Sequence, residues 1–179
     1  MGFEFAADIW LWSAHTVVVV AYAAFAVVGV VLAVIDLRSH RLPNRIVLPS
    51  YVGAMGLLAL ACLLGADWWQ LARAGAGMAA MFMFYFALRL VRPAGMGGGD
   101  VKLSGVVGLF LGWAGWAPLV VGALAAFLLG GIAGLVLMAA RKADRRTAIP
   151  FGPFMLLGAW VGIVAGDALA GLQGGSHVV

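Results

Sequence analysis

The chain is 179 residues long, and 65% of its residues are hydrophobic while only 10% are charged. This composition excludes a water-soluble globular protein and is typical of an integral membrane protein. The formal net charge is +4, but the basic residues lie in short connectors between apolar segments rather than on one soluble face. The charge therefore does not indicate binding to nucleic acid, and we expect the lipid bilayer to be the main environment of the chain.

Six apolar segments follow one another, and most approach the roughly 20 residues that a helix needs to cross a bilayer. Such long, continuously apolar runs lack the alternation of a membrane β-barrel. We therefore predict an all-α, polytopic membrane protein with about six transmembrane helices, forming a single domain over residues 1–179 without a soluble domain. The fourth segment is short, so its helix could include flanking residues or cross a thinned bilayer, and a re-entrant hairpin is the third alternative. The segments are Ala14–Ile35, Ile46–Leu64, Ala72–Leu90, Leu103–Trp116, Leu119–Ala140 and Ile149–Ala170.

Lysine and arginine gather in the first, third and fifth connectors, which lie on one side of the predicted membrane. On the opposite side, only Arg73 is basic. The positive-inside rule places the basic connectors in the cytoplasm and both termini on the non-cytoplasmic side. The basic residues are Arg38, Arg41, Arg45, Arg89, Arg92, Lys102, Arg141, Lys142, Arg145 and Arg146.

Two aspartates stand at junctions between an apolar segment and a basic connector. Asp36 ends the first segment and Asp100 precedes the fourth, so two crossings separate them and they share the predicted cytoplasmic face. Two carboxylates that share a site do not both ionise readily, and the pair retains one proton over part of the pH range. The ionised member can take a proton from water while the protonated one polarises a peptide carbonyl, which is the chemistry of aspartic proteases.

Two other interpretations of these aspartates remain open. Asp36 could cap a helix end or pair with Arg38 or Arg41, and Asp100 could be the N-cap of the fourth helix. The pair could also carry protons in a proton-coupled transporter. Transport sites usually lie near the midplane of the membrane, however, whereas these aspartates are predicted at its edge.

Glycines surround the second aspartate. Gly97, Gly98 and Gly99 directly precede Asp100, and such a segment can adopt backbone conformations that other residues resist, move, and let a substrate strand approach closely. A dinucleotide-binding loop would require a strand before it and a helix after it, and a phosphate-binding loop would require Gly-Lys-Ser/Thr. A plain flexible linker is the alternative.

Three motifs together resemble those of the type IV prepilin peptidases, membrane aspartic proteases of the GxGD type. The first is an aspartate followed by a basic stretch and Pro-Asn, here Asp36 to Asn44, including Pro43. The second is the Gly97–Asp100 box followed by Lys102 and Leu103, and the third is Pro-Phe-Gly-Pro at residues 150–153. All three fall on the predicted cytoplasmic face, between residues 36 and 153.

The resemblance implies a peptidase that removes the basic leader of prepilins or pseudopilins, cleaving after a glycine at the cytoplasmic edge of the substrate helix. It implies that Asp36 and Asp100 are the catalytic pair. We expect the site to be shaped by Gly97, Gly98, Gly99, Lys102, Pro43, Asn44, Pro150, Gly152 and Pro153. Lys102 could tune Asp100 electrostatically or extend towards lipid phosphate. The implied location is the cytoplasmic (inner) membrane of a prokaryote, with the active site facing the cytoplasm.

The chain departs from the longer members of that family, whose cytoplasmic insertion carries paired CxxC motifs and which also methylate the new N-terminus. Cys62 is the sole cysteine and the histidines are scattered, so we expect no methyltransferase activity, metal or cofactor. The chain looks like the small, peptidase-only branch that often serves tight-adherence (Flp-type) pili.

Related membrane proteases are alternatives to that assignment. Archaeal preflagellin peptidases are near relatives. Presenilin-type proteases fit less well, because they need a Tyr-Asp motif and a Pro-Ala-Leu motif, whereas Ile35 precedes Asp36 here. The many Gly and Ala residues of the helices allow close packing within one chain or in a homo-oligomer.

Overall fold

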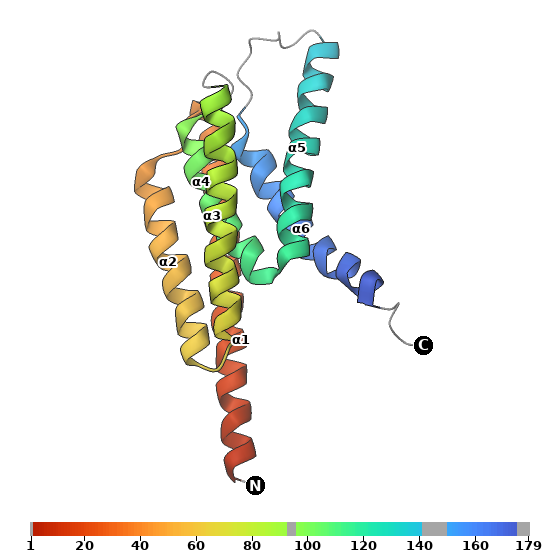
Figure 1. Ribbon diagram of the computed structural model, residues 1–179. Coiled ribbons are helices and arrows are strands. Elements are labelled where there is room, and N and C mark those ends of the chain that lie inside the picture. The colour runs from red at the N-terminus through yellow and green to blue at the C-terminus, as the bar shows by residue number, and fades with distance from the viewer. Residues whose placement is uncertain (1, 93–95, 141–149, 175–179) are drawn as a thin grey trace.

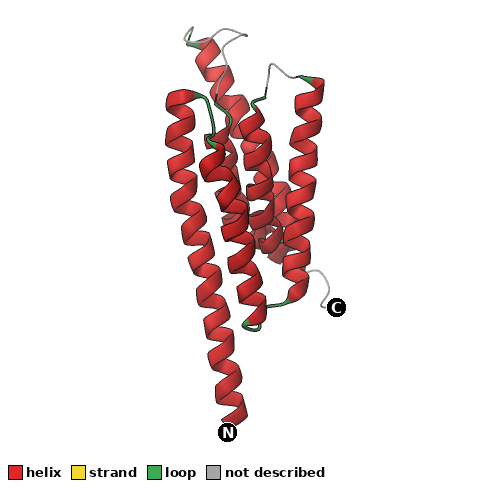
Figure 2. Cartoon of the chain, turned by 90° about the vertical axis from the view of Figure 1, so that its left-hand side faces the viewer, coloured by secondary structure: helices red, strands yellow, loops and turns green. Residues whose placement is uncertain are grey.

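The computed structural model describes residues 2–92, 96–140 and 150–174, and over these residues it consists of helices without strands (Figures 1 and 2). The all-α prediction is confirmed. The helices are α1 (Gly2–Ser39), α2 (Asn44–Leu63), α3 (Trp68–Val91), α4 (Gly98–Ala114), α5 (Trp116–Ala139) and α6 (Gly152–Gly174).

Within the described residues, four helices are long and apolar enough to span a membrane: α2, α3, α5 and the part of α1 from Trp12 to Ser39. In α6, the apolar part of the described helix runs over Gly152–Gly166, and α4 has 17 residues. Many large apolar side chains on the long helices face outward, including Val52 and Leu128. An outer surface of this kind requires lipid around it, because in water it would drive association. The chain is a multi-pass membrane protein.

The fourth helix is the centre of the bundle. Every residue of α4 from Leu103 to Trp113 is buried, and a helix that is apolar on all sides belongs in such an interior position. The other helices shield it from lipid, so its short length does not leave backbone groups facing hydrocarbon. The helix begins at Gly98, five residues before the predicted apolar segment, and ends before Trp116, so it recruits residues that precede the segment. It is one continuous helix rather than a hairpin.

Small residues let α3 and α4 pack against each other in antiparallel orientation (Figure 1). A Cβ atom added to Gly77 would lie 2.6 Å from the carbonyl oxygen of Gly108 and 2.9 Å from Cα of Gly112. Near the start of α3 and the end of α4, the Arg73 guanidinium donates hydrogen bonds to the carbonyls of Gly112 (2.7 Å) and Trp113 (2.6 Å). Arg73 thereby satisfies carbonyls that the helix end leaves without intrahelical partners.

A second tight pair, α5 and α6, lies beside the first four helices (Figure 1). Its contact is also built from glycine: a Cβ atom on Gly158 would lie 2.5 Å from the Ala126 nitrogen, and one on Gly162 would lie 2.5 Å from the Pro118 oxygen. These small residues serve packing within one chain. The homo-oligomer considered from the sequence stays a prediction.

The helices alternate in direction, so the α1–α2 connection and the start of α4 lie at the same end of the bundle, at the top in Figure 1. The start of α6 lies there as well. All three sequence motifs therefore meet at one end. The predicted fifth connector and Ile149 fall within residues 141–149, outside the described part of the chain.

Candidate active site

Asp36 is buried in the last turns of α1, with only 3% of its surface exposed. Its Oδ2 atom accepts a hydrogen bond of 3.1 Å from the backbone N–H of Gly152, at the first residue of α6. Asp36 lies three residues before the end of α1 at Ser39. It is therefore held by another helix instead of by a basic neighbour. Both interpretations of Asp36 as a helix cap or as a partner of Arg38 or Arg41 were wrong, because the described contacts of its side chain include neither arginine.

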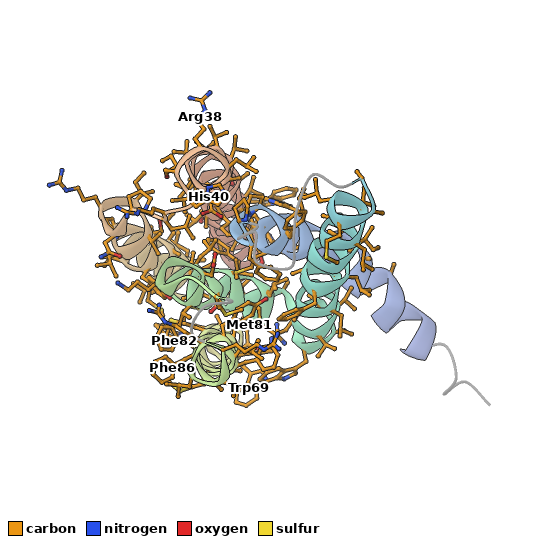
Figure 3. All side chains as sticks on the ribbon, turned by 90° about the horizontal axis from the view of Figure 1, so that it is seen from above. Arg38, His40, Trp69, Met81, Phe82 and Phe86 are labelled. Carbon is orange, nitrogen blue, oxygen red and sulfur yellow. The ribbon has the colours of Figure 1, made fainter. Side chains whose placement is uncertain are left out.

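A residue in the left-handed conformation directly follows the helix that carries Asp36. His40 has φ of 51° and donates its backbone N–H to the carbonyl of Asp36 at 2.8 Å. A non-glycine residue in this conformation is uncommon, and such residues cluster at functional sites. Viewed from above the site, Arg38 projects away from the bundle, whereas His40 lies inside its outline (Figure 3). The turn at His40 brings Arg41 and Leu42 to the edge of the same pocket as Asp36.

Asp100 is the third residue of α4 and is 9% exposed. Its Oδ2 atom accepts a hydrogen bond of 3.1 Å from the backbone N–H of Gly97, the residue that precedes the helix. This contact satisfies one of the amides that a helix start leaves without an intrahelical partner. The suggestion that Asp100 is the N-cap was wrong in position, since Gly97 is the N-cap and the carboxylate reaches back to it.

The two carboxylates line one pocket of about 250 Å³. Within the described residues, only Oδ2 of each accepts a hydrogen bond from the protein, and neither Oδ1 atom does. The Oδ1 atom of each carboxylate is thus available to accept a hydrogen bond, since no donor in the described part of the chain binds it. The pocket is lined by Asp36, His40, Arg41, Leu42, Gly97, Gly98, Gly99 and Asp100.

The glycines beside Asp100 allow close approach by two other segments. A Cβ atom on Gly99 would lie 2.7 Å from Cβ of the buried Leu42, and one on Gly98 would collide with the Arg89 guanidinium. Gly98 and Gly99 are helical residues at the start of α4. The small size of Gly99 therefore lets the first motif contact the second, and that of Gly98 lets Arg89 of α3 approach the start of α4. The mobility expected from the sequence stays a prediction.

A third contact between the motifs involves Asn44 and Lys102. The Lys102 ammonium donates a hydrogen bond of 3.0 Å to Oδ1 of Asn44, the first residue of α2. Pro43 is the N-cap of that helix, and its carbonyl accepts the N–H groups of Ile46 and Val47. Lys102 thus links the start of α2 to α4. This contact differs from both roles suggested from the sequence, which were electrostatic tuning of Asp100 and extension towards lipid phosphate. None of Pro43, Asn44 and Lys102 lines the pocket.

The Pro-Phe-Gly-Pro motif reaches the site through Gly152. A Cβ atom at this position would lie 2.7 Å from Oδ2 of Asp36, so the hydrogen bond to the carboxylate requires a residue without a side chain. Pro153 lies in the first turn of α6, where the absence of an N–H group is tolerated. Pro150 and Pro153 do not line the pocket. Phe151 packs against Tyr85 and Phe127 in an aromatic cluster.

Four residues near the aspartates were missed in the sequence: His40, Leu42, Tyr85 and Arg89. His40 and Leu42 fall inside the first motif, but from the sequence, roles were assigned there only to the charged residues, Pro43 and Asn44. Tyr85 and Arg89 lie in α3, which carries no recognisable motif. Their relation to Asp100 depends on the packing register of α3 against α4. Within the described residues, no group of three or more His, Cys, Asp or Glu side chains could hold a metal ion.

Comparison with known proteins shows which family the chain is similar to. Residues 23–138 match the model of the type IV leader peptidase family. A prepilin leader peptidase/N-methyltransferase of Stutzerimonas stutzeri is 30% identical over 164 residues, which cover 88% of this chain and 52% of the relative. Proteins of the same name from Pseudomonas putida and Bacillus subtilis are 34% and 29% identical, covering 77% and 78% of this chain.

The chain spans about half the length of these curated relatives: 52%, 47% and 53% in the three cases. No solved structure matches the chain significantly. The family match extends over more than half of the chain and includes both aspartates, together with the first two of the motifs that meet at one end of the bundle. The chain belongs to the type IV leader peptidase family.

Proposed function

We propose that this protein is an aspartic endopeptidase that removes the leader of type IV prepilins or pseudopilins, with Asp36 and Asp100 as its catalytic pair. The observation that carries the proposal is the burial of these two carboxylates in one pocket, although they come from segments 64 residues apart in the chain. Buried carboxylates are rare unless they are paired or functional. The names of the curated relatives supply the substrate class.

The proposed reaction needs only the two carboxyl groups and a water molecule. The ionised aspartate removes a proton from water as its oxygen attacks the peptide carbonyl, and the protonated aspartate donates a hydrogen bond to the carbonyl oxygen. Collapse of the tetrahedral intermediate transfers a proton to the leaving amine and breaks the C–N bond. The hydrogen bonds from Gly152 and Gly97 hold each carboxylate by one oxygen and leave the other available for this chemistry.

The proposal also covers the setting of the reaction. We infer six crossings of the inner membrane of a prokaryote, with residues 1–179 forming one peptidase domain and the motifs of residues 36–153 facing the cytoplasm. The excess of Lys and Arg near the motif-bearing end supports this orientation. A cytoplasmic site would meet a prepilin where its basic leader joins the apolar helix, and we propose cleavage there, after a glycine.

Co-expression with a Flp-type prepilin tests the proposed function. We expect the wild-type protein to remove the leader, and the Asp36→Asn and Asp100→Asn variants to accumulate at normal levels without cleaving, because an amide cannot exchange the proton. Asp67→Asn is the matched control. Asp67 caps α3 at the opposite end by accepting the Trp69 N–H at 2.9 Å, and asparagine caps helices equally well.

Mass spectrometry of the pilin reports both the cleavage site and any change at the new N-terminus. Full cleavage by Asp36→Asn or by Asp100→Asn would contradict the catalytic assignment. The relatives are also named N-methyltransferases, and the expectation that this chain lacks that activity stays a prediction. It requires the product to carry a free amine, without the added mass of a methyl group.

A further inference from the structure

Tyr85 carries a buried hydroxyl that no contact within the protein explains. Its side chain is fully buried, and its Oη atom is the only buried side-chain nitrogen or oxygen among the described residues that has no hydrogen-bond partner. Burying a hydroxyl without a partner is unfavourable by about 1–3 kcal/mol on mutational scales. A native protein retains such a group only for a reason, and a role in catalysis is one of the recognised reasons.

The ring of Tyr85 does not need its hydroxyl for packing. Its centroid lies 5.6 Å from that of Phe84, 5.5 Å from that of Phe127 and 5.9 Å from that of Phe151. Phenylalanine would make the same aromatic contacts in this cluster of phenylalanines. The hydroxyl is therefore the part of Tyr85 that requires a function.

The register of α3 against α4 places Tyr85 opposite Asp100. Successive contacts along the antiparallel pair join Gly77 to Gly108, and Met81 to Ser104, whose Oγ donates to the Met81 carbonyl at 3.4 Å. One turn further along each helix, the same register sets Tyr85 opposite Asp100.

Contacts on the far side of Tyr85 agree with that register. The Arg89 guanidinium, one turn beyond Tyr85, lies against Gly98 at the start of α4. Phe151, which packs on the Tyr85 ring, directly precedes the Gly152 amide that binds Asp36. Tyr85 and Asp100 are also close enough to interact electrostatically. Tyr85 thus lies between the start of α4, which carries Asp100, and the start of α6, which binds Asp36.

We propose that Tyr85 is a positioning residue for the catalytic pair, whose hydroxyl donates a hydrogen bond to the Asp100 carboxylate when substrate occupies the site. The Oδ1 atom of Asp100 has no donor among the described residues and is the acceptor. Catalytic hydrogen bonds that are open in a free enzyme commonly tighten only in the substrate complex. The inference rests on the proposed function.

The experiment compares Tyr85→Phe with Tyr22→Phe in purified protein cleaving a prepilin peptide. Each variant loses one phenol hydroxyl, but the half-buried Tyr22 hydroxyl already donates to the Phe110 carbonyl at 2.9 Å. We expect Tyr85→Phe to lower kcat by roughly ten- to a hundredfold, as for a lost hydrogen bond to a charged group, with KM little changed. Its melting temperature should equal or exceed that of the wild type. Tyr22→Phe should melt at a lower temperature and keep its kcat.

The outcomes separate this inference from the function on which it rests. A Tyr85→Phe variant with wild-type kcat would overturn the inference while leaving the peptidase intact. A loss of kcat accompanied by a fall in melting temperature as large as that of Tyr22→Phe would assign Tyr85 a merely structural role and overturn it too. A wild-type protein that cleaves no prepilin would overturn the proposed function and the inference together.

Discussion

At the residue scale, the backbone N–H of Gly152 holds the Asp36 carboxylate in place. This group binds Oδ2 of Asp36, and there is no space for a side chain between the two. The contact crosses from α6 to α1, so it fixes the Asp36 carboxylate relative to a helix 116 residues away in the chain. Holding a reacting group in place contributes to the rate of an enzyme because small displacements are heavily penalised.

Replacing Gly152 by alanine should therefore impair catalysis while leaving the protein folded. We expect Gly152→Ala to lower kcat/KM by about a hundredfold, the order of loss for a displacement of about 1 Å. Gly56→Ala is the control, since a Cβ atom on Gly56 meets nothing within 4 Å. Cleavage kinetics on a prepilin peptide measure both. Wild-type kinetics in Gly152→Ala would mean that the Gly152 contact does not position Asp36.

At the element scale, the buried helix α4 carries Asp100, and its position depends on contact with α3. The glycines of both helices bring the two backbones together, and Arg73 holds the carbonyls at the end of α4. A displacement of α4 would move Asp100 and break the register that sets Tyr85 opposite it. Packing at this contact and the geometry of the site are thus linked.

A methyl group inserted into this contact should destabilise the bundle. We expect Gly77→Ala to lower the free energy of unfolding by about 1–3 kcal/mol, the usual range for overpacking. Gly75→Ala in the same helix should be neutral or stabilising by up to about 1 kcal/mol, because its Cβ atom would meet nothing within 4 Å. Unfolding in detergent, followed by circular dichroism, gives both values. Equal stability of the two variants would contradict the packing described for α3 and α4.

The sequence predicted the helices and the position of both aspartates at one end of the bundle, because long apolar runs and local motifs are properties of contiguous residues. It placed the start of the fourth apolar segment at Leu103 and Asp100 at the start of the helix, whereas α4 begins at Gly98. Glycine has a low helix propensity, which argues against a helix at Gly98 and Gly99. Leu42 and Arg89, however, occupy the space that side chains at these two positions would need. Tyr85 could not be found, since α3 is apolar on several faces and its register against α4 is not encoded in any local pattern.

At the scale of the whole molecule, three motifs from different parts of the chain converge because the helices alternate in direction. The residues of the first, second and third motifs meet at the end of the bundle where α1 ends and α4 and α6 begin (Figure 1). The opposite end carries Trp68 and Trp69, which are exposed as expected for side chains at a membrane interface. The orientation of the bundle decides which compartment the site faces.

Labelling of single cysteines tests this orientation in a Cys62→Ala background, where no other thiol is present. We expect Ser39→Cys, at the exposed end of α1 beside the site, to react with a membrane-impermeant maleimide only after the inner membrane is opened. Trp69→Cys, at the opposite end, should react in spheroplasts with an intact inner membrane. The reversed pattern would place the site outside the cytoplasm and contradict the orientation proposed from the basic residues.

The central claim is that Asp36 and Asp100 act as one catalytic unit, and a double-mutant cycle on kcat/KM tests it most directly. Residues that act as a unit are strongly non-additive, so removing either should be about as damaging as removing both. We predict that Asp36→Asn, Asp100→Asn and the double variant all fall to the same background rate of prepilin cleavage. A single variant that retains substantial activity, or a double variant whose loss is the product of two partial losses, would contradict the account.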